Sequence, residues 1–130
     1  MKQIDISDLI GVKFVYNGRN AATGFDCYGL AIEVAKRFGH KLADVKYEKG
    51  GIQTFADNYE AVLAMLSESV KKTEKREAGN PVVFFSKGRA VHIGILLDEE
   101  NFIHADIGGV RVENLDNYYR KEWSVFEWLK

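Results

Sequence analysis

The stretch Gly24-Phe25-Asp26-Cys27-Tyr28-Gly29-Leu30 contains the only cysteine of the chain and joins a glycine-bearing loop to a helical hydrophobic pattern. After Cys27, apolar or small residues recur with the i, i+3, i+4, i+7 spacing of a helix face that packs on a core. These residues are Leu30, Ala31, Val34, Ala35 and Phe38. The pattern predicts a helix that begins near Cys27 and stops at Gly39, because glycine is typical of helix C-termini.

Cys27 lies on the apolar face of this predicted helix, in its first turn. The first-turn amides lack intrahelical partners and the helix dipole is positive there, so both favour an anion. Asp26 precedes the helix and is a typical N-cap residue. We therefore expect a lowered pKa for the Cys27 thiol, which would make it reactive. The alternative is a buried, unreactive cysteine, since free cysteine is among the most buried residue types.

Composition limits the classes of protein to which the chain can belong. Its 130 residues are 46% hydrophobic, which predicts a single domain over residues 1–130 with its own core. Eighteen basic and nineteen acidic residues leave a formal net charge of −1, so we expect no nucleic-acid partner. One cysteine cannot form an internal disulfide. No stretch approaches the length of a membrane span, so we expect no membrane insertion.

The first half of the chain is predicted to be mainly helical. Residues 4–10 have the pattern of a short helix that turns Ile6, Leu9 and Ile10 inward. Apolar spacing from Phe55 to Leu66 predicts a second long helix.

Polar segments separate these predicted helices. Residues 17–24 and 40–53 contain glycines and little periodicity, so both are predicted loops. The charged run 71–77 is interpreted as the solvated end of the second helix or a turn.

From Pro81 onward the pattern changes from helical to extended. Short segments rich in β-branched and aromatic residues alternate with turn-forming residues, as in an antiparallel meander. The segments are residues 82–85, 91–97, 101–105, 110–112 and a closing strand at 123–129. Helices followed by antiparallel strands predict an α+β fold in which the N-terminal helices pack on the meander.

Two histidines lie on neighbouring predicted strands. His92 has Gly94 as its same-face neighbour, which leaves room beside the imidazole, and His104 lies on the strand expected to pair with it. Either histidine taken alone is better explained as a buried core residue than as a catalytic one. With Cys27 they match the logic of thiol hydrolases, in which His92 is the base and His104 bonds its other nitrogen. His40, in a loop, is expected to face solvent.

A metal site is the alternative use of these side chains. Zinc accepts ligands such as Cys27, His92, His104 and Asp106. The pattern lacks the paired short spacings of structural zinc sites. We therefore expect no metal and no cofactor.

Four stretches, in this order and spacing, resemble the NlpC/P60 family of bacterial cell-wall cysteine peptidases. They are residues 24–30, 83–85, 88–95 and 102–105, within a resemblance that runs from about Gly11 to Leu115. The resemblance implies a papain-like α+β fold. It also implies cleavage of peptidoglycan stem peptides next to a γ-D-glutamyl residue linked to a diamino acid.

By position, the resemblance makes Cys27 the nucleophile, His92 the base and His104 the third polar member. The Cys27 N–H is a natural oxyanion donor. Asp26 and Tyr16 are the expected supporting residues of the site.

Arginines and one tyrosine are candidates for substrate binding. Arg19 and Arg89 are hypothesised to read substrate carboxylates, and Tyr28 to contact the peptide. Three places depart from the family pattern: Phe14 replaces an expected tyrosine, Tyr28 a common serine, and Asn80-Pro81 the more usual acidic residue and leucine. The aromatic at Tyr28 is more similar to the phage-tail branch of the family.

The expected function is therefore a peptidoglycan endopeptidase or amidase that acts through a Cys-His-His triad and an acyl-enzyme. One alternative is a non-catalytic component of a phage tail that binds phage proteins, and another is an amidase or deamidase effector with a different substrate. Asp5 and Asp8 stand where a signal peptide needs an apolar run. We expect synthesis in the cytoplasm and action at the cell wall, reached by export, lysis or a phage particle.

Overall fold

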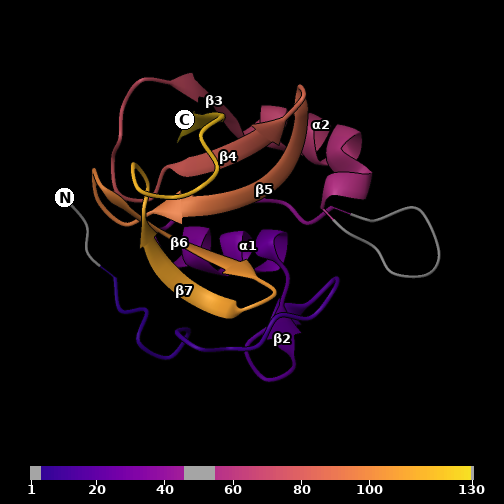
Figure 1. Ribbon diagram of the computed structural model, residues 1–130, viewed down its shortest axis with the longest axis vertical. Coiled ribbons are helices and arrows are strands. Elements are labelled where there is room, and N and C mark those ends of the chain that lie inside the picture. The colour runs from indigo at the N-terminus through magenta and orange to yellow at the C-terminus, as the bar shows by residue number, and fades with distance from the viewer. Residues whose placement is uncertain (1–3, 46–54, 130) are drawn as a thin grey trace.

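The computed structural model describes residues 4–45 and 55–129, which form two α-helices and two antiparallel sheets (Figure 1). In chain order the elements are β1 Arg19–Asn20, β2 Gly24–Phe25, α1 Cys27–Arg37, the 3-10 helix η1 Ala56–Asn58, α2 Tyr59–Ser69, β3 Val70–Thr73, β4 Pro81–Ser86, β5 Arg89–Leu96, β6 Asn101–Asp106, β7 Gly109–Asn114 and β8 Trp123–Trp128.

The larger sheet has the strand order β3-β8-β4-β5-β6-β7, and every neighbouring pair in it is antiparallel. Strands β4 to β7 follow one another as a meander, while β8 returns to lie between β3 and β4. Helix α1 packs on β5 and β6, and α2 packs on β5 and β3. This arrangement confirms the predicted α+β fold with helices on an antiparallel meander.

Pairing between β5 and β6 is short. The two strands are in register only at Ile95 with Ile103 and at Leu96 with Phe102. By contrast, β6 and β7 pair over their whole length. The first residues of β5 and the last residues of β6 therefore pair with β4 and β7 but not with each other, and both border a cleft.

Helix α1 begins where its sequence predicts. The Asp26 side chain accepts a 2.7 Å hydrogen bond from the Gly29 N–H, as an N-cap should. Gly39, which follows the helix, has a φ of 90°, a backbone conformation that favours glycine. The helix buries one face against the sheet, including Cys27, Leu30, Ala31, Val34 and Ala35.

The sheet has a core on each face, because residues alternate sides along its strands. The core between the helices and the sheet contains Val83, Ile93, Ile95 and Ile103. The opposite core is smaller and combines aromatic with aliphatic side chains. Its buried members are Val82, Phe84, Leu96, Phe102, Leu115, Tyr118 and Val125.

The N-terminal helix prediction is wrong. Residues 7–11 form turns, and Ile10 is 47% exposed, whereas Leu9 is fully buried as expected. Backbone hydrogen bonds from Gly11 N to Val110 O and from Val110 N to Val12 O tie this segment to β7 instead. Ile4, Ile6 and Leu9 pack against the core between the helices and the sheet from a segment that is not helical.

Two further local predictions are corrected by long-range contacts. The charged run does not prolong α2, because its first residues belong to β3 and pair with β8, as in Lys72 with Phe126. His40 does not simply face solvent: its imidazole stacks on the Trp128 ring with centroids 4.7 Å apart.

Residues 46–53 of the predicted loop lie outside the described residues. No helix in the described ranges is long and apolar enough to cross a membrane.

Replacing Gly29 by alanine should destabilise the protein. A Cβ at Gly29 would lie 2.0 Å from the backbone oxygen of Gly18, so the loop before the helix must move. We expect Gly29→Ala to cost about 1–3 kcal/mol of unfolding free energy, measured by urea denaturation. Helix propensity alone predicts the opposite sign, a gain of about 1 kcal/mol, so a stabilised variant would contradict this packing.

Candidate active site

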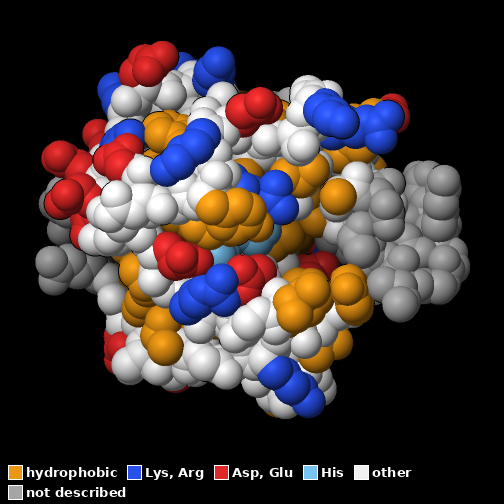
Figure 2. All heavy atoms as spheres, viewed as in Figure 1, with side chains coloured by type: hydrophobic (Ala, Val, Ile, Leu, Met, Phe, Trp, Pro, Cys, Tyr) orange, Lys and Arg blue, Asp and Glu red, His pale blue; other side chains and the backbone are white. Residues whose placement is uncertain are grey.

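A cleft of about 410 Å³ lies where the start of α1 meets the parts of β5 and β6 that do not pair with each other. Its lining includes Cys27 from α1, His92 from β5 and Asp106 from β6. Figure 2 shows histidine at the bottom of a hollow on this face, with hydrophobic, acidic and basic side chains around its edge. The structure thus brings the predicted nucleophile and the predicted base to one cavity.

Cys27 is 5% exposed and is the first residue of α1. Burial is the main cause that raises the pKa of its thiol, and the nearby Asp26 carboxylate adds to the rise. Hydrogen bonds from the backbone N–H groups of Ile93 and Tyr28 favour the anion but do not offset burial. The expectation of a lowered thiol pKa is therefore wrong for the free protein, because desolvation outweighs the helix N-terminus.

His92 and His104 are joined by a hydrogen bond. The distance from His92 Nε2 to His104 Nδ1 is 2.7 Å. Burial, followed by the neighbouring His104, lowers the pKa of His92 to about 3, and burial also lowers that of His104. Rings of Phe84 and Phe102 pack against these imidazoles. Both histidines are therefore held neutral in a largely aromatic environment.

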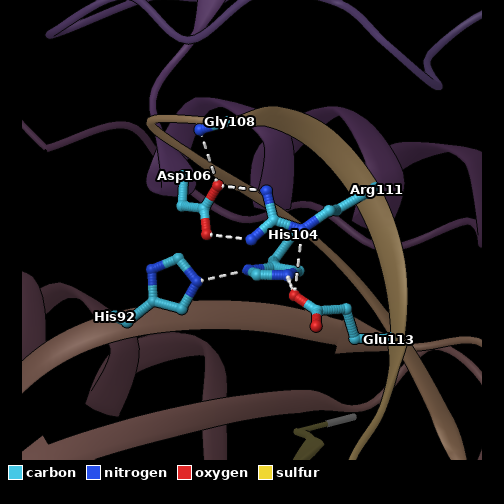
Figure 3. A network of polar contacts seen from close by, with 6 residues as sticks. All are labelled: His92, His104, Asp106, Gly108, Arg111 and Glu113. Carbon is cyan, nitrogen blue, oxygen red and sulfur yellow. Dashed lines mark hydrogen bonds and ion pairs between the residues drawn. The ribbon is translucent and has the colours of Figure 1, made fainter. Parts of the chain in front are cut away.

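A carboxylate lies behind His104. Glu113 Oε2 is 2.7 Å from His104 Nε2 and also accepts a 3.1 Å hydrogen bond from Arg111 Nε. The other two Arg111 nitrogens each contact Asp106 at 2.5 Å. Figure 3 shows the resulting row from His92 through His104 to Glu113, with Arg111 bridging the two carboxylates.

This row determines the positions of the imidazole protons. A carboxylate only accepts, so His104 Nε2 must carry the proton that it shares with Glu113. Neutral His104 then has a lone pair on Nδ1, and His92 Nε2 must donate to it. His92 Nδ1 is left unprotonated, which is the form needed to accept a thiol proton.

Sequence reasoning missed Glu113 and Arg111. They are two residues apart on β7 and so share a face, and the strand register pairs Arg111 with His104. The turn at Gly108 and Gly109 was visible in the sequence. The register that follows from it was the signal that could have placed both side chains beside His104.

Both predicted supporting residues line the cleft, but their contacts differ. Tyr16 lines the cleft and packs edge-on against Phe14. Asp26 also borders the cleft, but its carboxylate caps Gly29 and accepts a 2.7 Å hydrogen bond from Arg19 Nη1. Asp26 is therefore mainly a structural anchor of the cysteine loop.

The predicted substrate-binding residues do not gather at the cleft. The Arg19 guanidinium contacts Asp26 and Asp44. The Tyr28 side chain is fully buried, and its hydroxyl donates to Ala43 O at 2.7 Å. Arg89 lies over the Tyr59 ring, 5.4 Å from its centroid. None of these three is among the cleft-lining residues within the described part of the chain.

One group of potential metal ligands occurs in the described ranges. Ligand atoms of His104, Asp106 and Glu113 lie within 4.8 Å of one another. Arg111 forms ion pairs with both carboxylates, so a cationic side chain already balances their charge. This set does not include Cys27 or His92, which the predicted zinc alternative required.

Comparison with known proteins agrees with this architecture. The model of the NlpC/P60 family matches residues 11–128. Among solved structures, the chain is similar to the crystal structure of the NlpC/p60 domain of the peptidoglycan hydrolase SagA, with a TM-score of 0.58 and 21% sequence identity over 91% of this chain and 88% of that chain. At this identity the likeness shows the fold. No curated protein matches the chain.

The raised thiol pKa predicts how Cys27 reacts without substrate. Because burial keeps the sulfur protonated, the rate of alkylation by iodoacetamide should still be rising with pH above the ordinary cysteine pKa of about 8.5. The rate is measured by mass spectrometry of the labelled protein, with free cysteine as the control. A plateau between pH 5 and 8 would instead indicate a preformed thiolate–imidazolium pair.

Proposed function

This chain belongs to the NlpC/P60 family, and we propose that it is a cysteine peptidase that hydrolyses stem peptides of bacterial peptidoglycan. The observation that carries the proposal is the cleft that Cys27 and His92 share, with His104 bonded to the far nitrogen of His92. SagA, whose domain has the same fold, is a peptidoglycan hydrolase. Together these support both the reaction type and the substrate class.

The proposed reaction begins from a neutral thiol and a neutral imidazole. His92 Nδ1 removes the Cys27 proton as the sulfur attacks the peptide carbonyl carbon. Because the proton moves within the pair, the cleft gains no net charge, which matters in a buried site. The Asp26 carboxylate caps the amide of Gly29, so the Cys27 N–H remains the candidate donor to the oxyanion.

The remaining steps use the same groups. The tetrahedral intermediate collapses, the C–N bond breaks, and His92 transfers its proton to the leaving amine, which leaves a thioester on Cys27. Water then attacks the thioester, and His92 takes one of its protons. Collapse of the second intermediate returns the proton to sulfur and releases the carboxylic acid.

Glu113 is proposed as a positioning residue. A neutral third histidine stabilises an imidazolium less than a carboxylate would. Here the carboxylate acts through His104, which it holds with Nδ1 toward His92. Arg111 and Asp106 in turn hold Glu113 in place.

The finer specificity rests on the family resemblance. It favours cleavage beside a γ-D-glutamyl residue linked to a diamino acid. Action at the cell wall and delivery by export, lysis or a phage particle stay predictions. A phage-tail role has only the departures at Phe14 and Tyr28 in its favour, and hydrolysis of another amide would use the same chemistry.

Loss of the nucleophile should abolish activity. Cys27→Ala, or complete alkylation of Cys27 by iodoacetamide at alkaline pH, confirmed by mass spectrometry, should remove lysis of purified cell walls, because no other cysteine is present. Mass spectrometry of the released muropeptides identifies the bond cut. Undiminished lysis after either treatment would rule out the mechanism, whereas an inert wild-type protein that co-purifies with a phage structural protein would favour the tail role.

Glu113→Gln should lower kcat more than it raises KM. A glutamine amide can donate to His104 Nε2, which would reverse both tautomers and protonate His92 Nδ1. We expect a loss of about 10- to 100-fold in kcat, smaller than the ~10⁴ found when a buried triad aspartate becomes asparagine. Glu113→Asp, which keeps the carboxylate, is the matched control. Nitrogen NMR of the imidazoles should report the tautomer change; unchanged kcat and spectra would disprove the role.

A further inference from the structure

Two arginines line the cleft, and their surroundings differ. Arg111 uses its guanidinium on Asp106 and Glu113. Arg120 also lines the cleft, but it forms no ion pair within the described ranges. Its guanidinium carbon lies 5.2 Å from the centroid of the Tyr119 ring. Among the described residues none accepts a hydrogen bond from this guanidinium, so Arg120 is a cation at the cleft with donors available to a ligand.

Most other arginines in the described residues have acidic partners. Arginine ion pairs join Arg19 to Asp26, Arg37 to Asp8, Arg76 to Asp116 and Arg111 to Asp106. Arg89 shares with Arg120 an aromatic contact in place of an ion pair, but it borders a separate hollow beside Lys87. Of the two, only Arg120 shares a cavity with Cys27 and His92.

We propose that Arg120 binds a free carboxylate of the substrate next to the scissile bond. The inference rests on the proposed function and adds a specificity-determining residue to it. A γ-linked glutamyl residue suits this role, because linkage through its side chain leaves its α-carboxylate free. A guanidinium can hold such a group through two parallel hydrogen bonds.

The position of Arg120 also connects recognition to the base. Burial and His104 are the main causes that lower the pKa of His92, the charges of Arg120 and Arg111 lower it further, and Asp106 opposes them. A substrate carboxylate on Arg120 would offset its charge. Proton transfer from Cys27 to His92 would then become easier when the correct substrate is bound. A substrate without the carboxylate should lose both affinity and rate.

The surrounding surface fits an extended peptide. Tyr119 is 70% exposed and Ile107 is 81% exposed, and both line the same cleft. Such exposed apolar side chains mark a binding surface when they border a cavity. They would contact the peptide on either side of the carboxylate.

The test compares two peptides that differ in one group. One is L-Ala-γ-D-Glu joined to a diamino acid, and the other carries a carboxamide in place of the glutamyl α-carboxylate; each is made with lysine and with diaminopimelate. The wild-type protein should cleave the acid with about 10- to 100-fold higher kcat/KM. Arg120→Gln should remove this preference, and Arg120→Lys should restore part of it. Arg76→Gln, which removes a paired arginine elsewhere, should keep it.

Measuring peptide binding distinguishes failure of this inference from failure of the proposed function. Calorimetry on the Cys27→Ala protein should show tighter binding of the acid than of the amide, and the added Arg120→Gln change should abolish the difference. The inference is overturned if the preference for the acid survives Arg120→Gln. It is also overturned if the protein that keeps Arg120 binds both peptides equally. Binding that depends on Arg120 without cleavage of either peptide supports the inference and counts against the peptidase.

Discussion

The hydrogen bond between His92 and His104 is the interaction on which the site depends. It joins two strands whose backbone pairing is limited to two residue pairs. Gly94 makes the approach possible, because a Cβ there would lie 2.8 Å from the Phe102 ring and 3.4 Å from His104 Cβ. The strand spacing, the glycine and the aromatic packing together hold the two imidazoles at bonding distance.

Burial gives this site its chemical character. Desolvation raises the pKa of Cys27 and lowers that of His92, so each charged form is disfavoured on its own. Charged groups lie next to the histidine pair and can offset this cost: Glu113 contacts His104 and is itself held by Arg111. A neutral resting state that becomes polar only as the proton moves is consistent with a base acting during attack. In the proposed role of Arg120, a carboxylate bound in the cleft would offset its charge and so shift the same equilibrium.

Local patterns predicted the elements whose burial follows a regular period. The helix at Cys27 has a cap, an apolar stripe and a terminating glycine, and it forms as expected. The meander was predicted because β-branched strands alternate with turn residues. The predictions failed where a contact with a distant segment determines the local structure: Gly11 and Val12, which follow the predicted N-terminal helix, bond to β7, and Lys71 to Thr73 pair with β8. Spacing alone carries no information about such partners.

The α+β class, the helix that presents Cys27 and the placing of His92 and His104 on neighbouring strands could all be read from the sequence, because they follow from local periodicity and short hairpins. The folded chain alone shows that Glu113 lies behind His104, that Arg19 binds Asp26, and that Arg120 lines the cleft without an acidic partner among the described residues. Which side chains meet depends on the strand register and on where each loop brings the chain back, and neither follows from local periodicity. Burial likewise decided the protonation of the thiol, since desolvation is a property of the whole packed fold.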